Sequence, residues 1–435
     1  MIDSKKRNYH YILIAGLFLC LVARDVIGLS INKYMILGFI VFIFAISNVE
    51  ELVAELFFIF PLFHGLPGTY IALAGIVIYL VKQREHSKQA FISAVFFAFL
   101  EIVASIWYPT FDLTAIVKYL SVLMLFIFLL LDNIEIDYKK CIMVYFLGLI
   151  CFCFVIVISR IIEAPSNWTT LFASGQFRFG ELVDTDAEGI HLRSNANELG
   201  YYSLVGVCIG LFLLENVEKK DKKWLVLGSI FIALSGYLSL SRTWIVLVAL
   251  VLFLYFVRQL RSIRRTIVFA VVFWGLFYLV YRFFLSNTDL LTGIITRFNY
   301  INTSSLNNRI PIMKSYWDAF INNPRYLFLG SGVTQYLTVI GIKESMHNML
   351  EQIIVCYGIM GACIYFFIMI KSVMVAKRNK TSFESWIPLI GVLLYTQTSQ
   401  FVNPSVLMLP YVVAVACIRI KINNEKVEER HEIHV

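Results

Sequence analysis

Three short polar stretches, each directly before an apolar run, hold the residues of this sequence that are best suited to chemistry. They are residues 193–197, 239–243 and 345–348. Each offers serine or asparagine as a helix cap, so we expect each to be the outward-facing start of a helix that crosses the membrane. The free backbone N–H groups and the positive dipole end of such a helix favour an anion, notably a phosphate.

Two of these stretches add an arginine, Arg193 and Arg242. A guanidinium group can donate two parallel hydrogen bonds to phosphate oxygens. If the fold brings the stretches together, these arginines and the cap residues Asn197 and Asn348 form a floor that binds pyrophosphate. The alternative is that Arg242 only anchors a helix end at the membrane surface and that Arg193 is solvated in a loop.

His347 is the candidate for moving a proton or positioning a hydroxyl group. Glu351 follows four residues later, which would place it on the same helical face and let it orient the imidazole. The helix N-terminus favours the neutral imidazole that a general base requires. A purely structural histidine is the competing interpretation. His64 and His191 have no such carboxylate partner and are weaker candidates.

Composition excludes most other classes of protein. The chain has 435 residues, of which 59% are hydrophobic and 15% charged, so it is a polytopic helical membrane protein. It has no phosphate-binding loop, dinucleotide fingerprint or zinc-hydrolase motif, and we expect no cofactor and no nucleic-acid partner. All eight cysteines lie in or beside apolar runs, so neither disulfides nor a zinc site are expected. The acidic run at 181–188 fits no compact metal cage, and we expect no metal.

The elements that must position these residues are about 12–14 membrane-spanning helices in an all-α bundle. The expected spans are 9–24, 33–48, 51–65, 67–82, 89–107, 115–131, 141–162, 197–214, 224–240, 243–257, 267–285, 347–370, 386–401 and 404–420. A single re-entrant hairpin is the alternative for 51–82, where Pro61 and residues 65–68 interrupt the apolar pattern. Residues 1–435 then form one membrane domain.

Lysine and arginine gather in the loops at 82–88, 139–140, 219–223, 258–265 and 371–380, which predicts that these loops and both termini are cytoplasmic. Two long segments face outward, 163–196 and 286–346. The second is a large extracytoplasmic loop over the active site, and it contains a short amphipathic helix. Ile312, Tyr316, Trp317 and Phe320 recur at helical spacing, and we expect the helix to lie at the outer interface with Tyr316 and Trp317 at headgroup level.

From residue 177 to residue 361 the sequence resembles the O-antigen ligase and Wzy-type polysaccharide polymerase family of membrane proteins. The matching residues are 193–200, 238–243, Asn308-Arg309 with Trp317 and Pro324, 329–332, His347-Asn348 and 358–361. The family's proline-containing stretch is here 193–197 without a proline, so either Arg178 or Arg193 corresponds to the family's first arginine. The resemblance implies that this arginine, Arg242, Arg309 and His347 are essential.

The resemblance also implies a glycosyltransferase in the bacterial cytoplasmic membrane, with an active site outside the cytoplasm. We expect a polymerase that moves a growing glycan from undecaprenyl pyrophosphate to a lipid-linked repeat unit, without metal and with inversion. A chain-length regulator and a flippase of the same pathway are the expected partners, beside membrane lipid. The alternatives are a ligase with the same donor and a different acceptor, or a flippase of lipid-linked oligosaccharides.

Overall fold

A computed structural model gives the fold of the chain. It describes residues 2–106, 112–180, 195–259, 305–334, 336–337, 346–377, 381–399, 401–402 and 405–420, with isolated residues between 267 and 296. The regular secondary structure of this described part is all helical, and the prediction of an all-α polytopic membrane protein is confirmed. The predicted span at 267–285 lies almost entirely outside it.

The described helices follow the predicted spans closely. In chain order they are α1 (Ile2–Asp25), α2 (Lys33–Ile46), α3 (Val49–Ile59), η1 (Phe60–Gly65), α4 (Gly68–Lys82), α5 (Lys88–Ile106), α6 (Leu113–Leu131), α7 (Tyr138–Ile162), α8 (Trp168–Ala173), α9 (Ala196–Asn216), η2 (Lys219–Asp221), α10 (Lys222–Leu238), α11 (Arg242–Gln259), α14 (Ser305–Asn322), α15 (Pro324–Leu329), α17 (Met349–Ala376), η4 (Phe383–Trp386), α18 (Ile387–Thr396), η5 (Ser405–Met408) and α19 (Leu409–Arg419). Among them α5, α6, α7, α9 and α17 are long and apolar enough to cross a membrane.

Polar caps fix where several of these helices begin. The side chain of Asn48 accepts a hydrogen bond from Glu51 N, and the side chain of Glu51 accepts one from Asn48 N, which forms a capping box at the start of α3. Asp112 and Asp137 cap α6 and α7 more simply, because each side chain accepts one backbone N–H of the first turn and no side chain donates or accepts in return. Pro61 and the glycines that follow replace α-helix with the 3-10 turn η1. The region 51–82 is therefore two short helices, α3 and α4, joined by η1.

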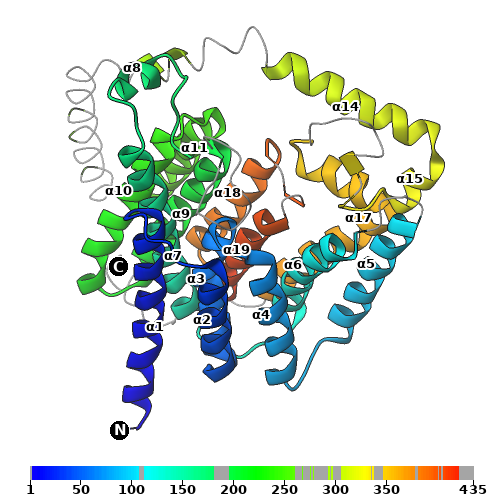
Figure 1. Ribbon diagram of the computed structural model, residues 1–435, viewed down its shortest axis with the longest axis horizontal. Helices are drawn as coiled ribbons and strands as arrows, with labels where there is room; N and C mark the ends of the chain where they lie inside the picture. The colour runs from blue at the N-terminus through cyan, green and yellow to red at the C-terminus, as the bar shows by residue number, and fades with distance from the viewer. Residues whose placement is uncertain are drawn as a thin grey trace, which may run out of the picture.

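The helices pack around a continuous apolar core to which α7, α9 and α19 contribute most of their length. Figure 1 shows α8, α14 and α15 at one end of this bundle and the start of α1 at the opposite end. We call the first the loop end and the second the basic end, because Lys82 and Lys140 lie there. Lys82 Nζ donates to Phe44 O at the end of α2 (2.8 Å), and Lys140 Nζ lies 3.2 Å from Glu50 Oε1 at the start of α3.

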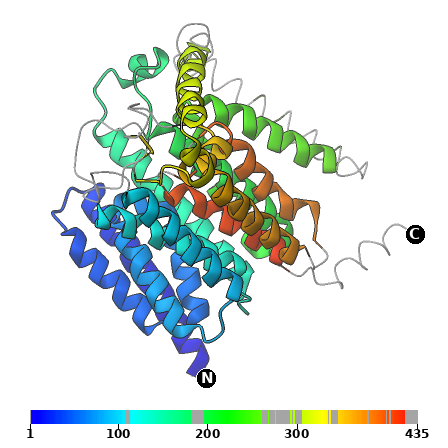
Figure 2. The same cartoon turned by 90° about the vertical axis from the view of Figure 1, so that its right-hand side faces the viewer.

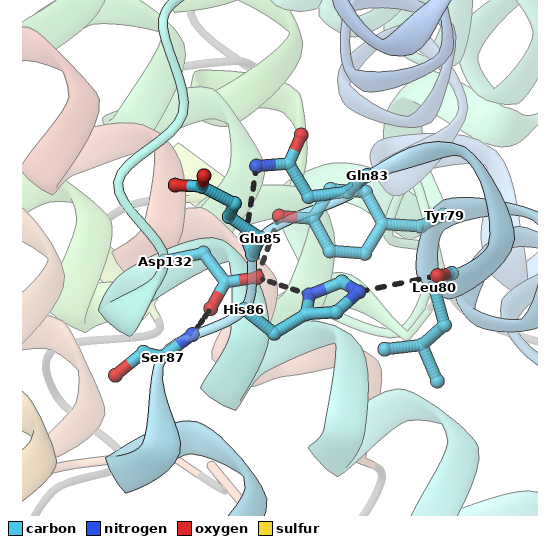
Figure 3. Close-up of polar contacts among 7 residues, drawn as sticks. All are labelled: Tyr79, Leu80, Gln83, Glu85, His86, Ser87 and Asp132. Carbon is cyan, nitrogen blue, oxygen red and sulfur yellow. Dashed lines mark hydrogen bonds and ion pairs between the residues drawn. The ribbon is translucent and has the colours of Figure 1, made fainter.

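At the basic end, the turn between α4 and α5 is fixed by Asp132, which caps the end of α6 and is 1% exposed. Its carboxylate accepts hydrogen bonds from Tyr79 Oη (2.9 Å) and from Ser87 N (2.8 Å), and it pairs with His86 Nδ1 at 2.9 Å. His86 Nε2 lies 3.1 Å from Leu80 O. Figure 3 shows these groups converging on one carboxylate. This network stabilises the end of the bundle that lies away from α8, α14 and α15.

The loop helix is present, but its aromatic face is buried. α14 (Ser305–Asn322) carries Tyr316 and Phe320, which are 0% and 1% exposed. The ring of Tyr316 stacks on Tyr336 with centroids 6.2 Å apart. Tyr316 therefore packs against the protein and does not face lipid headgroups, whereas the position of α14 at the outer interface stays a prediction. Burial also raises the pKa of the Tyr316 hydroxyl.

Candidate functional site

The first predicted helix start is the N-terminus of α9. Asn195 is the cap, and its Oδ1 accepts hydrogen bonds from Asn197 N and Glu198 N, both at 2.9 Å. Glu198 completes a capping box by accepting from Asn195 N at 3.3 Å. Asn197 is exposed on the first turn. The sequence therefore places an uncovered polar side chain at the positive end of this helix.

The second helix start is the N-terminus of α11, where Arg242 is the first helical residue. Ser241 is 1% exposed, and its Oγ accepts from Trp244 N at 3.5 Å, which is the position of an N-cap. The residue before it, Leu240, has φ of 49° and is fully buried. A bulky residue held in left-handed backbone is strained, and such strain is found at functional turns. The turn between α10 and α11 is thus held in a fixed shape by its surroundings.

The third helix start is the N-terminus of α17. Asn348 is the cap, and its Oδ1 accepts from Leu350 N (2.9 Å) and Glu351 N (3.2 Å). His347 is half-buried and lies in the extended residues before this cap. The premise that His347 and Glu351 share one helical face is therefore wrong, because the helix begins only at Met349. Orientation of His347 by Glu351 stays a prediction without that geometric support.

The end of α18 joins all three helix starts. The Tyr395 hydroxyl donates to Asn197 O on α9 (2.6 Å) and lies 3.0 Å from Ser241 Oγ, before α11. Asn348 Nδ2 donates to Gln397 O at 3.2 Å, which connects α17. We call residues 395–398 the hub. The fold thus brings together the described parts of the three polar stretches. That was the condition for a shared anion site.

A further contact completes the hub on the side of α11. Thr398 Oγ1 donates to Thr243 Oγ1 at 3.1 Å. The α9 and α11 ends approach so closely that a Cβ atom at Gly200 would lie 2.8 Å from both Ser241 Cβ and the Tyr395 hydroxyl oxygen. Only glycine fits at that position. This close contact at Gly200 fixes the separation between the starts of α9 and α11.

Arg178 reaches the same place from the outer segment after α8. Its Nε donates to Ser239 O at 3.1 Å, and Phe179 N donates to Leu238 O at 3.3 Å. The guanidinium is near enough to Tyr395 to act on its hydroxyl electrostatically. Of the two arginines that the sequence left open, Arg178 is thus placed beside the turn that carries Arg242. Arg193 lies outside the described residues, as do His191 and the acidic run at 181–188.

Arg309 is placed only by its backbone, in the second turn of α14, and its side chain is outside the described atoms. The same holds for the side chain of His64 in η1. Figure 1 shows α14 crossing the loop end of the bundle. The structure therefore gives Arg309 a position on the loop helix and leaves its role as a predicted one.

Sequence reasoning missed the hub. Tyr395, Gln397 and Thr398 together touch all three helix starts, whereas the apolar pattern predicts only that they belong to the span 386–401. A signal was present: residues 395–399 form a run of five hydroxyl and amide side chains at the end of an apolar segment. Such a run at the end of a membrane helix is a candidate polar junction, because it would otherwise face lipid.

Comparison with known families covers the central part of this site. Residues 203–366 match the family described as O-antigen ligase. This match supports an O-antigen ligase and polymerase type of membrane family. Members of this family are glycosyltransferase-like enzymes that act on O-antigen, and the family implies a lipid-linked oligosaccharide substrate and a membrane setting. Arg242, Arg309, His347, Asn348 and Glu351 lie inside the matched range, whereas Arg178, Arg193 and Asn197 precede it. No curated protein matches the chain.

Proposed function

We propose that the chain polymerises a surface polysaccharide at the outer face of the bacterial cytoplasmic membrane. The donor is a glycan on undecaprenyl pyrophosphate, and the acceptor is the next lipid-linked repeat unit. The observation that carries the proposal is the meeting of three helix N-termini, with Arg178 and Arg242, around residues 395–398. Several positive helix-dipole ends at one point suit a pyrophosphate, and arginine side chains such as Arg178 and Arg242 can hydrogen-bond to its oxygens.

The proposed reaction is a single displacement at the anomeric carbon. The bond from that carbon to the pyrophosphate oxygen breaks, and the acceptor hydroxyl oxygen forms the new glycosidic bond. The pyrophosphate leaves with the electron pair, and the helix ends and arginines stabilise its charge. His347 takes the proton of the acceptor hydroxyl or positions that hydroxyl. One such displacement inverts the anomeric configuration, and no step needs a metal ion.

The remaining candidates receive supporting roles. Asn197 and Asn348 present polar side chains at the helix starts, where they can hydrogen-bond to the donor. Arg193 is proposed to bind the pyrophosphate together with Arg242, and Arg309, on the loop helix, is proposed to hold the acceptor. Glu351 is proposed to act on His347 from the first turn of α17.

The test is reconstitution of the purified chain with undecaprenyl-pyrophosphate-linked repeats, with product length and donor binding measured separately. His347→Ala is expected to abolish chain growth and to leave donor binding near the wild-type value. A positioned base contributes about a hundredfold to ten-thousandfold in rate. Glu351→Gln should give an intermediate loss. Long chains made by His347→Ala would return the histidine to a structural role, and loss of donor binding would move it to the pyrophosphate site.

A ligase is the second candidate, since the matched family carries that description. The donor and the pyrophosphate site would be unchanged, and only the acceptor would differ. The same vesicles separate the two, because a polymerase lengthens the glycan with the repeat unit as sole substrate. A ligase needs a different acceptor, so with the repeat unit alone it gives no series of progressively longer glycans. Movement of the lipid-linked repeat across the bilayer without new bonds would support a flippase instead.

A further inference from the structure

The large outer loop is fastened into α17 by residues 330–333, which we call the clamp segment. Ser331 N donates to Val355 O at 3.0 Å, and Gly332 N donates to Cys356 O at 2.9 Å. The Ser331 hydroxyl group also donates to Val355 O, at 3.0 Å. The clamp segment therefore uses backbone carbonyl groups of a membrane helix as its acceptors.

Those carbonyl groups are available because α17 is broken at Gly358, where φ is 63° and ψ is −174°. In an unbroken helix, each carbonyl accepts from the N–H four residues later. A Cβ atom at Gly358 would lie 2.3 Å from Phe328 O and 2.6 Å from Gly330 N, so the close approach of the loop requires glycine. The break makes residues 349–357 a separate half-helix, and Asn348 and His347 stand at its N-terminus.

Glu101, on α5, holds the other end of the clamp segment. α5 packs against α17, as Figure 2 shows. Glu101 is 0% exposed, and its Oε1 accepts from Val333 N at 2.9 Å. A Cβ atom at Gly332 would lie only 3.1 Å from Glu101 Oε2. The carboxyl group thus lies directly against the last two residues of the clamp.

A carboxyl group at this place is costly. Burying one in an apolar bundle is unfavourable unless it is paired, and acidic residues within membrane helices usually have a role. Among the described residues the Glu101 carboxyl makes this one hydrogen bond, and Oε2 makes none. The contact that accounts for Glu101 is therefore its hydrogen bond from the backbone amide of Val333.

We infer that Glu101 is a positioning residue for the transfer reaction. Its carboxyl group keeps the clamp segment in the break of α17, and so sets the position of the half-helix that carries Asn348 and His347. The effect on the reaction rests on the proposed function. The fastening of the loop does not, and it can be measured without any substrate.

Cys356 reports on the clamp directly. It is 0% exposed, and its carbonyl group accepts from Gly332 N. In a chain with Cys356 as the sole cysteine, the rate of modification by a small maleimide measures opening of the clamp. Leaving a buried N–H without its acceptor shifts such an equilibrium by about tenfold. Glu101→Met, which keeps the volume but removes the acceptor, should raise the rate about tenfold. Glu101→Gln, which still presents an acceptor oxygen, should stay within about twofold.

Glu55→Met is the matched control. Glu55 is also a buried carboxyl group, 2% exposed, but it accepts from Ser47 Oγ at the basic end. This variant should leave the Cys356 rate unchanged. Unfolding temperatures of all variants, measured in the same detergent, separate opening of the clamp from loss of fold.

Activity then tests the link to the site. Glu101→Met should lower kcat about tenfold with little change in KM, and Glu101→Gln should restore it. An unchanged Cys356 rate in Glu101→Met refutes the clamp. A raised Cys356 rate with wild-type kcat refutes the positioning role, as does equal loss of activity in both Glu101 variants. An inactive wild-type chain would refute the proposed function, and the Cys356 rates would still decide whether Glu101 holds the clamp.

Discussion

Removal of one hydroxyl group, by Tyr395→Phe, tests the hub most sharply. This hydroxyl links the start of α9 through Asn197 O and the start of α11 through Ser241 Oγ. The ring itself would stay in place, since it packs against Tyr201 with centroids 5.1 Å apart and is 1% exposed. The substitution therefore removes two hydrogen bonds and little else.

The size of the effect follows from these two bonds. Each contributes about 0.5–1.5 kcal/mol net, so the junction loses about 1–3 kcal/mol. If the three helix starts must stay in register to bind the leaving pyrophosphate, a loss of this size lowers kcat about 5- to 150-fold. Ser241 Oγ keeps its contact with Trp244 N, so the α11 cap should survive and the protein should still fold.

The assay pairs repeat-unit transfer in reconstituted vesicles with unfolding of the purified protein. Tyr411→Phe is the control, because Tyr411 is a tyrosine 2% exposed whose hydroxyl donates to Met369 O (2.9 Å) on α17 and not to a hub residue. Both variants should be slightly less stable, and only Tyr395→Phe should lose activity. Wild-type kcat in Tyr395→Phe, or equal losses in the two variants, would refute the reasoning.

Three further outcomes are expected. Arg242→Lys should be nearly as inactive as Arg242→Ala in the transfer assay, because lysine keeps the charge but loses the planar fork, and full-length product would leave Arg242 an interfacial anchor. On a cysteine-free background, a membrane-impermeant thiol reagent added outside cells should label Ser315→Cys on α14 and spare Glu85→Cys in the basic turn, and the reverse pattern would invert the topology. Asp132→Ala should destabilise the protein by about 3–5 kcal/mol in denaturant unfolding, because it breaks a buried pair, with a shift below about 1 kcal/mol contradicting that role.

The sequence predicted the helices well, because their apolar runs and caps are local properties. The helix starts at Asn195 and Asn348 were visible as a polar cap before an apolar run. What joins them was not, since contacts of Tyr395 with Asn197 and Ser241 depend on how distant helices pack. The break at Gly358 was likewise hidden inside an apolar run whose composition is that of one continuous helix. The tertiary contacts of the outer loop decide that break, and they also bury the face of α14 that its pattern suggested would meet lipid.

The hub also bears on which part of the chain is the working unit. The family match ends at residue 366, whereas the tyrosine that ties the helix starts together is residue 395. A protein cut after the matched region would retain Arg242 and His347 but lose the contacts that join the starts of α9, α11 and α17. Exchange of the matched region between relatives should therefore transfer activity only when the segment containing 395–398 is exchanged with it.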